Sequence, residues 1–369
     1  MVLKRTVFKD FRNIQNADIS FSDGMNIICG RNAQGKTNVL EGIYVFACGK
    51  SFRKTKFKDM VRFGSDSCSM RVVFTDSNRE NDMKINISES KRETVLNNIK
   101  ITKLADFVGH FRAVLFFPEH LSIVKSEPSV RRTFLDNAIS QIKPQYMVAI
   151  NEYAKLVTEK NSLLKNCEQY FDFENMFSVL SERMAKYSGY ITSERIKYTK
   201  LLFDKVSNFM TDMTNGKEQI SHLFVSNASK DGDANEDASL LEKYYYEEMM
   251  NGKSRELSAG TSIYGSHRDD IDIMLGGVSA RLFASQGQQR SIALAMKLAE
   301  GSICVEQTGD SPVFLLDDVL SELDRERKDY ILSKIEDRQV IITSCDESDF
   351  SGIDNVNKMY CSNGIYTQG

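Results

Sequence analysis

Residues 30–37, GRNAQGKT, have the types and spacing that bind a phosphate chain, because they fit the pattern G-x-x-x-x-G-K-[ST]. Glycine at the first and sixth positions lets the backbone approach the phosphates, which the N–H groups of a following helix then bind. Lys36 supplies a cation between the β- and γ-phosphates, and Thr37 offers a hydroxyl to Mg²⁺. A glycine turn beside an unrelated lysine is the alternative interpretation. The predicted nucleotide contacts are Gly30, Arg31, Asn32, Ala33, Gln34, Gly35, Lys36 and Thr37.

Two acidic residues, Asp317 and Asp318, directly follow the apolar run 313–316. A buried parallel strand delivers carboxylates in this way to the carboxyl edge of a sheet. We expect Asp317 to hold Mg²⁺, directly or through water, and Asp318 to orient or deprotonate the attacking water. Together with Lys36 they form the predicted catalytic set. A strand end with two solvated acids is the alternative that this pattern leaves open.

A basic stretch with interleaved phenylalanines lies shortly after the phosphate loop. Such a stretch binds nucleic-acid phosphates with little sequence preference, although a solvated basic loop has the same composition. Arg131 and Arg132 are weaker candidates for the same role. The predicted DNA contacts are Lys50, Arg53, Lys54, Lys56 and Lys58, with Arg131 and Arg132.

The phosphate loop must lie between a strand and a helix. Residues 25–29 predict the strand, and apolar residues at helical spacing over 38–46 predict the helix. Residues 3–8 and 17–21 alternate in polarity, and we expect them to join residues 25–29 in one sheet. Further strands are predicted at 70–74, 83–87, 93–96, 111–117, 271–275, 311–316 and 340–344, and a helix at 291–303.

The pattern is helical from about residue 119 to residue 250. Apolar stripes predict two long helices joined near 166–174, either as an extended hairpin of roughly 60 Å or as a compact helical subdomain. The chain is therefore expected to form an α/β domain split by a mainly helical insertion. The expected boundaries are 1–118, 119–255 and 256–369.

The composition is that of an ordinary soluble protein, with 41% hydrophobic and 27% charged residues in 369. No run is long enough to span a bilayer, and no apolar N-terminal signal region is visible. Seven dispersed cysteines without C-x-x-C spacing favour reduced thiols in a cytoplasm over disulfides or zinc. The net charge of −3 means that any binding of nucleic acid depends on local patches.

The stretch 284–290, ASQGQQR, resembles the signature motif of ABC-type ATPases, and 319–324 resembles the D-loop that follows the acidic strand in that superfamily. The resemblance implies an ABC-type P-loop ATPase domain with a mixed sheet and flanking helices. It also implies that Ser285, Gly287 and Gln288 face the γ-phosphate of ATP held by a second protomer. A serine and a glycine at the N-terminus of a helix can form such an anion site.

Several short motifs, in the right order and spread over the whole chain, resemble the RecF family of recombination mediators, which is related to the SMC ATPases. The resemblance implies an ATP-dependent homodimer with slow, DNA-stimulated ATPase activity, used as a switch on single-stranded and on gapped or junction DNA. It also implies work with RecR and RecO in loading RecA, in replication and in the SOS response. Glu119 then lies where related ATPases contact Mg²⁺ or water. His267 belongs to a structural or nucleotide-sensing loop, and direct chemistry by its ring is the alternative. The motifs are FRN (11–13), QGKTN (34–38), KSFR (50–53), FPE (117–119), RRTFLD (131–136), GSHRDD (265–270) and SQGQQR (285–290).

Two other functions remain as alternatives. The ATP-binding subunit of an ABC transporter would carry a switch histidine after the strand at 340–344, where this chain has only Thr343 or Ser344 as weak substitutes. A structural SMC-like tether would need a coiled coil of hundreds of residues, and the helical insertion is much shorter.

Overall fold

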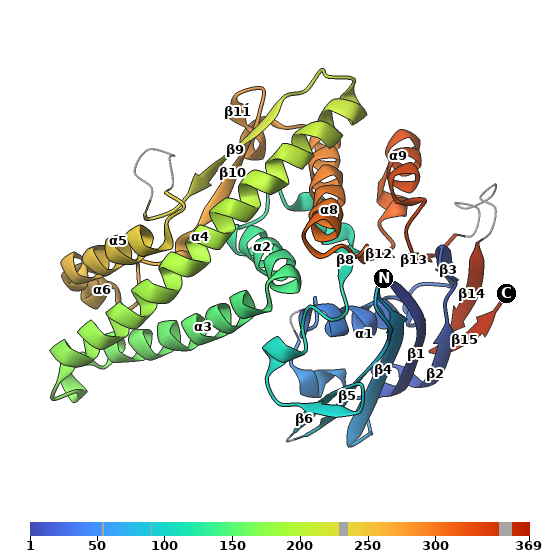
Figure 1. Cartoon of the computed structure of the whole chain (residues 1–369), viewed down its shortest axis with the longest axis horizontal. Helices are drawn as coiled ribbons and strands as arrows, with labels where there is room; N and C mark the ends of the chain where they lie inside the picture. The colour runs from blue at the N-terminus through green and yellow to red at the C-terminus, as the bar shows by residue number, and fades with distance from the viewer. Residues whose placement is uncertain (54, 90, 229–234, 347–355) are drawn as a thin grey trace. The chain divides into compact units, whose positions relative to one another are not determined.

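The computed structural model describes residues 1–53, 55–89, 91–228, 235–346 and 356–369 (Figure 1). The chain forms two compact units, Met1–Ser122 with Arg290–Gly369, and Ile123–Gln289. The second unit is thus an insertion in the first. These limits differ from the expected domain boundaries at 118/119 and 255/256, most of all at the second. Lys54, one of the predicted DNA contacts, lies outside the described residues.

The first unit contains a six-stranded sheet that carries the phosphate loop. Strands β14, β3, β13, β12 and β8 pair in parallel in that order, and β15 adds an antiparallel edge. Strands β13, β12 and the edge strand β8 are buried along their whole length, as expected for a parallel sheet covered on both faces. The strands are β3 (Met25–Cys29), β8 (Ala113–Phe116), β12 (Val313–Asp317), β13 (Val340–Ser344), β14 (Asn357–Ser362) and β15 (Ile365–Gln368).

A second, antiparallel sheet in the same unit has the strand order β2-β1-β4-β5-β6-β7. The expectation that the first three strands share one sheet is wrong, because β3 belongs to the parallel sheet. Burial explains the difference: β1 and β2 alternate between core and solvent, whereas four of the five residues of β3 are buried. The strands are β1 (Val2–Phe11), β2 (Ile14–Ser20), β4 (Ser67–Thr75), β5 (Glu80–Ser88), β6 (Arg92–Leu96) and β7 (Ile99–Ile101).

Helix α1 (Lys36–Cys48) packs against strands of both sheets and is buried along most of its length. The approach is close: a Cβ at Gly42 would lie 2.4 Å from the ring of Phe8. One hydrophobic core therefore joins both sheets to the helix that follows the phosphate loop. The other helices of this unit are η1 (Phe57–Met60), η2 (Leu104–Asp106), η3 (Pro118–Ser122), most of α8 (Gln286–Thr308), η6 (Leu320–Glu322) and α9 (Arg325–Ile335).

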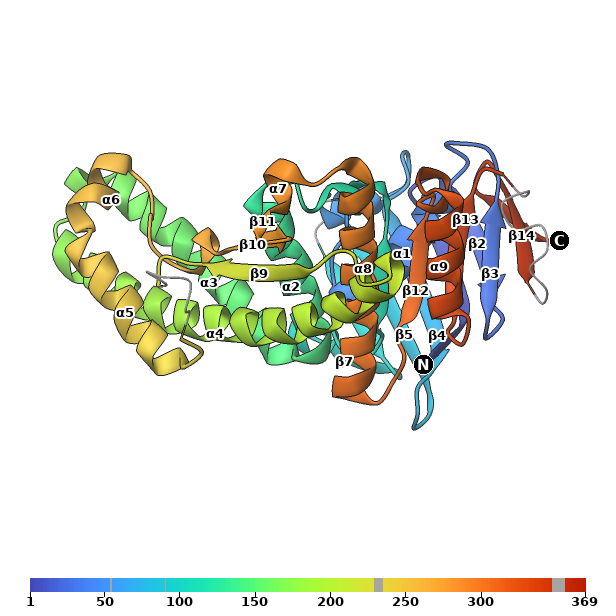
Figure 2. The ribbon, with the colours of Figure 1, turned by 90° about the horizontal axis from the view of Figure 1, so that it is seen from above.

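The second unit is built on the helical hairpin of α3 and α4. These helices run antiparallel and are joined over residues 166–172, and α5 packs along α4 (Figures 1 and 2). The extended hairpin is thus the arrangement found, and α4, with 42 residues, is about 63 Å long. The helices are α2 (Pro128–Ile142), α3 (Pro144–Lys165), η4 (Cys167–Gln169), α4 (Phe173–Thr214), α5 (Ala238–Asn251), α6 (Lys253–Ala259), η5 (Ser266–Arg268) and α7 (Ala280–Phe283).

A three-stranded antiparallel sheet completes the second unit, with β10 (Asp270–Leu275) between β9 (Ile220–Val225) and β11 (Val278–Ser279). The sequence places residues 271–275 in the C-terminal part of the ATPase domain. In the structure Ile271 pairs with Phe224 of β9, which draws this strand into the inserted unit. Among the described residues, no helix combines the length and the hydropathy needed to cross a bilayer.

Candidate functional site

The phosphate loop links the end of β3 to the start of α1, and its backbone needs the residues that the sequence provides. Gly35 has φ +117°, where other residues are strained, and a Cβ at Gly30 would lie 2.3 Å from the carbonyl oxygen of Cys361. Ala33 also adopts a positive φ, 64°. At Gly30 and Gly35 the loop backbone therefore adopts a conformation, or lies so close to its neighbours, that a larger side chain would not fit.

Contacts from two other parts of the first unit hold the loop in place. The side-chain amide of Asn13 and the backbone N–H of Gly364 both donate to the carbonyl oxygen of Gln34, at 3.0 and 2.8 Å. The hydroxyl of Tyr366 donates to the carbonyl oxygen of Gly35 at 3.0 Å. The turn before β2 and the terminal hairpin β14–β15 thus preorganise the loop.

Lys36 is the first residue of α1 and is 7% exposed. Its ammonium group donates to the carbonyl oxygens of Gly30 and Arg31, and the thiol of Cys345 lies 3.2 Å away. These carbonyl groups hold the cation within the loop, where phosphate oxygens can replace some of them as partners.

Asp317 and Thr37 meet at the carboxyl end of β12, as the two sequence patterns together predict. The hydroxyls of Thr37 and Thr343 both donate to the same carboxylate oxygen of Asp317, at 2.8 and 2.7 Å. Burial raises the pKa of Asp317, which is 6% exposed, and the two hydroxyls oppose this shift. A buried carboxylate beside a hydroxyl matches the oxygen ligands that Mg²⁺ takes when nucleotide phosphates supply the rest.

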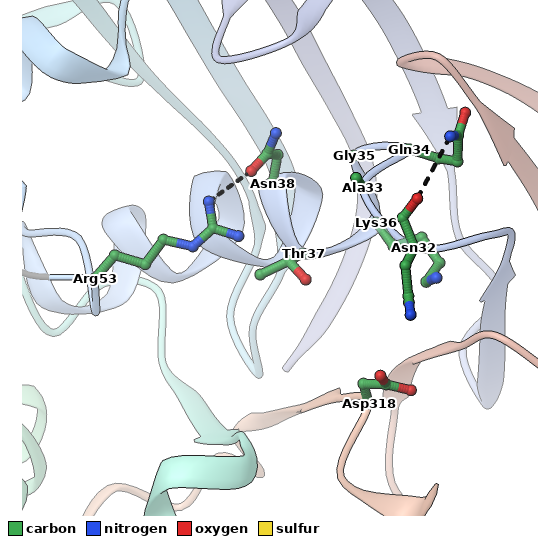
Figure 3. A pocket seen from close by; sticks show the side chains of 9 residues that line it. All are labelled: Asn32, Ala33, Gln34, Gly35, Lys36, Thr37, Asn38, Arg53 and Asp318. Atoms are coloured by element: carbon green, nitrogen blue, oxygen red, sulfur yellow. Dashed lines mark hydrogen bonds between the residues drawn. The ribbon is translucent and has the colours of Figure 1, made fainter.

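Asp318 lies across the cavity from the phosphate loop (Figure 3). It has a positive φ of 52°, and its backbone N–H donates to the hydroxyl of Thr343 at 3.0 Å. Thr343 therefore positions both acidic residues. The sequence names Thr343 only as a weak substitute for a switch histidine, whereas the structure gives it two hydrogen bonds in the site.

The cavity between the loop and Asp318 has a volume of about 320 Å³. Arg53 also lines it and donates to the side-chain oxygen of Asn38 at 2.8 Å (Figure 3). Arg53 also contacts Glu41, a fully buried acid on α1 that pairs with Arg12 and accepts from Ser51. The sequence assigns Arg53 to DNA, whereas the structure places it at the nucleotide cavity, because Glu41 draws the KSFR segment towards α1.

The signature residues begin helix α8 and belong to the second unit. The backbone N–H of Ser285 donates to Gln288 Oε1 at 2.7 Å, and the N–H of Gln288 donates back to the hydroxyl of Ser285 at 3.2 Å. This reciprocal capping fixes the N-terminus of the helix. Ser285 is exposed, while Gly287 and Gln288 are half-buried. The side-chain amide of Gln288 also donates to the carboxylate of Glu218, a residue of the same unit.

The other predicted residues divide into exposed and buried groups. Glu119 is exposed on η3 and does not line the phosphate cavity. Lys50, Lys56 and Lys58 are exposed, as a contact with DNA requires. Arg131 is 2% exposed, and its guanidinium is held by Asp270 and three backbone carbonyls. Arg131 is thus not available to DNA in this structure.

Arg132 and His267 have partners inside the second unit. Arg132 is half-buried and donates to the carbonyl oxygen of Asp269 at 2.8 Å. His267 lies 2.6 Å from the hydroxyl of Tyr153 and 3.1 Å from the carbonyl oxygen of Ser262. Burial lowers the pKa of His267 to about 4, so the ring is neutral at physiological pH. The GSHRDD and RRTFLD motifs therefore meet in a buried polar network.

Three residues of the site were not predicted from the sequence. Asn38 lines the cavity, Glu41 anchors two arginines beneath it, and Cys345 donates to the side chain of Asn32 at 2.7 Å. Glu41 had a detectable signal, because an acid within an otherwise apolar helical stripe requires a partner when it is buried. No comparable pattern surrounds Asn38 or Cys345.

Comparison with known proteins places these features in a family context. The family model described as "RecF/RecN/SMC N terminal domain" matches residues 2–367. The chain is 36% identical to the DNA replication and repair protein RecF of Clostridium acetobutylicum, with 93% of the chain and 92% of the relative covered. It is 35% identical to RecF of Ruminiclostridium cellulolyticum, with 98% of the chain and 97% of the relative covered.

Solved structures show the same relationship. A structure of the recombination mediator protein RecF with ATPrS in the RecFOR pathway superposes with a TM-score of 0.92 at 32% identity, covering 99% of this chain and 97% of that one. The corresponding structure with ATP has the same TM-score at 31% identity, covering 100% and 97%. The Smc head domain of Pyrococcus furiosus, at 14% identity and a TM-score of 0.56 with 100% and 96% covered, shares the fold. The expected fold of an ABC-type ATPase with a helical arm is confirmed.

Proposed function

The chain belongs to the RecF family, and from that premise we propose that it is an ATP-dependent DNA-binding switch of recombinational repair and replication. Its relatives are named for DNA replication and repair, and related RecF structures carry ATP or ATPrS in the RecFOR pathway. The match over nearly the whole length favours this function over a transporter subunit or a structural tether.

The observation that carries the proposal is the convergence of Lys36, Thr37 and Asp317 on one edge of the parallel sheet. Thr37 and Asp317 lie 2.8 Å apart and would hold Mg²⁺, which supplies charge neutralisation for the phosphates of bound ATP. Lys36 would bind the β- and γ-phosphates, and Asp318 would orient water for slow hydrolysis. This activity is that of a weak, DNA-stimulated ATPase.

The site is completed in the proposal by a second copy of the chain. Ser285 is exposed at a capped helix N-terminus, which favours an anion, and Gly287 follows it. Leu282 and Phe283, just before this motif, are 72% and 70% exposed. Adjacent apolar side chains with such exposure favour cover by another surface. A symmetric dimer would place each motif against the γ-phosphate held by the partner.

DNA would be held when ATP closes the dimer and released after hydrolysis. Lys50, Lys56 and Lys58 are exposed candidates for contacts with gapped or junction DNA and its single-stranded part. In keeping with the family resemblance, the proposed partners are RecR and RecO in the loading of RecA. The proposed setting is the cytoplasm, during replication and the SOS response.

Gel filtration of the full-length chain with ATP, with ADP and without nucleotide tests the switch. We expect a dimer only with ATP, further stabilised by gapped DNA. Lys36→Arg should reduce both dimer formation and hydrolysis, because the longer, planar guanidinium cannot keep the geometry of the lysine. Lys103→Arg, an exposed change elsewhere in the first unit, is the matched control. A monomer in all three conditions would contradict the mechanism.

A further inference from the structure

The solvent face of the antiparallel sheet bears a basic groove that lies apart from the nucleotide cavity. Its cations come from four strands and the turn before β6, and they are Lys9, Lys84, Lys91, Arg92 and Lys100. We call these five residues and the space between them the sheet groove. Its volume is about 910 Å³, compared with about 320 Å³ for the nucleotide cavity.

The strand register explains why the groove is polar on one side only. Lys9 pairs with Ser69, Ser69 with Asn86, and Asn86 with Glu93, which makes one row across four strands. The alternate residues, such as Met70 and Ile85, are buried in the core. Because strand residues alternate between faces, Lys9, Lys84 and Lys100 point away from the core, whereas Arg92, which pairs with the buried Ile87, lies on the other face at the rim of the groove.

Charge sets the class of ligand. The groove is lined by five basic and two acidic residues, although the whole chain has a net charge of −3. All five basic residues are exposed. Among the described residues, no carboxylate forms an ion pair with Lys9 or Lys91. A concave surface with excess positive charge attracts a polyanion, and serine and asparagine side chains can donate to its phosphates.

The side chains that line the groove also favour double-stranded over single-stranded nucleic acid. Single-stranded nucleic acid is typically held by exposed aromatic rings on which bases stack, and none of the described residues that line the groove is aromatic. The ring of Phe57 on η1 is covered by the guanidinium of Arg92, whose central carbon lies 4.5 Å from the ring centroid. Stacking holds the guanidinium in one orientation, from which its N–H groups can donate to phosphates.

The dimensions fit a duplex. Five neighbouring strands at about 4.8 Å spacing make the groove about 19 Å wide. Duplex DNA carries one phosphate per about 1.7 Å of axis, so a length of about 19 Å carries about eleven phosphates, of which those on the side facing the groove can contact its cations. Building on the proposed function, we propose that the sheet groove binds the phosphate backbone of double-stranded DNA beside a gap or junction.

One ion pair within the groove allows a substitution that should strengthen duplex binding, whereas loss of a groove lysine should weaken it. Glu93 and Lys100 lie 2.5 Å apart and are 43% and 66% exposed. An exposed pair of this kind is weak, so a phosphate can compete for Lys100. Glu93→Gln removes the competing charge and should strengthen duplex binding by a few-fold.

The experiment measures the affinity of the full-length protein, with ATP, for a blunt duplex and for a single strand of equal length at several salt concentrations. Lys84→Ala/Lys91→Ala should weaken duplex binding roughly tenfold and lower the salt slope by about two, since two phosphate contacts are lost. Binding of the single strand and of ATP should not change. Lys103→Ala/Lys334→Ala removes two exposed lysines outside the groove and is the matched control.

The outcomes separate this inference from the function on which it rests. If the wild type binds duplex and the groove variant binds it equally well with the same salt slope, the groove assignment is wrong. An equal loss of single-strand and duplex binding in the groove variant would overturn the selection for duplex. If the wild type binds ATP but no DNA, the proposed function itself fails.

Discussion

Thr343 shows how one hydroxyl can organise two acidic side chains. It is 1% exposed, donates to Asp317 and accepts from the backbone N–H of Asp318. Burial makes Asp317 costly to ionise, and hydrogen bonds to its charged form offset part of this cost. If Asp317 holds Mg²⁺ as proposed, the affinity for the ion depends on Thr343 as well as on its direct ligands.

Replacing Thr343 by valine should weaken Mg²⁺-dependent ATP binding about tenfold, because a buried hydrogen bond of about 1–2 kcal/mol is lost at nearly constant shape. The pKa of Asp317 is already raised, and the substitution should raise it further. A proton then competes with Mg²⁺ at higher pH, so the defect should grow as the pH falls. Titration with a fluorescent ATP analogue at several pH values and Mg²⁺ concentrations measures this.

Thr343→Ser keeps the hydroxyl and is the control for this prediction. We expect the serine variant to bind within a few-fold of the wild type. Equal affinities for the valine variant and the wild type at every pH would show that Thr343 does not position Asp317.

Short elements in the second unit depend on buried polar contacts. The segment η5 carries His267, whose ring contacts Tyr153, while the neighbouring Asp269 pairs with Arg195. A Cβ at Gly265, the residue before η5, would lie 2.1 Å from the hydroxyl of Tyr153, and its φ is +130°. The GSHRDD motif is therefore explained by packing between η5 and the helical hairpin.

The stability of this region should fall as the pH decreases. His267 has a pKa of about 4 in the folded chain, below its ordinary value of 6.5, so the unfolded chain binds the proton more readily. Its contribution is fully present above pH 6.5 and is lost as the pH falls towards 4, by at most about 3 kcal/mol. His267→Gln should be less stable at neutral pH, with a smaller loss of stability on acidification.

Chemical denaturation at pH 7.5, 6 and 4.5 measures the difference in the free energy of unfolding between the two proteins. Subtracting the curves removes the shared effect of the carboxylates. A constant difference across this range would mean that His267 does not titrate with an altered pKa.

At the scale of the whole molecule, each unit carries residues of the proposed composite ATP site. The phosphate loop and the acidic residues belong to the first unit, while Ser285 and Gly287 belong to the second. If the phosphate loop of one chain acts with the signature motif of the other, a loop variant and a signature-motif variant can be mixed to form one dimer. The resulting mixed dimer keeps one intact composite site.

Lys36→Arg and Ser285→Arg should each abolish most of the ATPase activity alone. An equal mixture of the two variants should recover up to about one quarter of the wild-type rate at protein concentrations that keep the variants dimeric, because half of the random dimers are mixed and each has one intact site of two. The measurement is ATP hydrolysis per protomer in the presence of duplex DNA. A mixture that gives only the average of the two separate variants would exclude sites shared between protomers.

The sequence alone was sufficient for features that depend on near neighbours. The glycine spacing before Lys36 specifies the loop backbone, and the apolar run before Asp317 specifies a buried strand end. The periodicity of residues 147–209 predicted the long helices, although it left the hairpin and the compact subdomain as alternatives. Each of these features lies within a few turns of helix or one strand, where local sterics and burial decide the structure.

Tertiary structure decided which distant segments pair. Alternation in β1 and in residues 271–275 predicts strands but not partners, so β3 joined a different sheet and β10 paired with β9. The burial of Arg131 depends on Asp270, which is 139 residues away in the sequence, and the position of Arg53 depends on Glu41, 12 residues away on another element. A charge pattern cannot distinguish a solvated arginine from a paired one, because the desolvation that separates them exists only after folding.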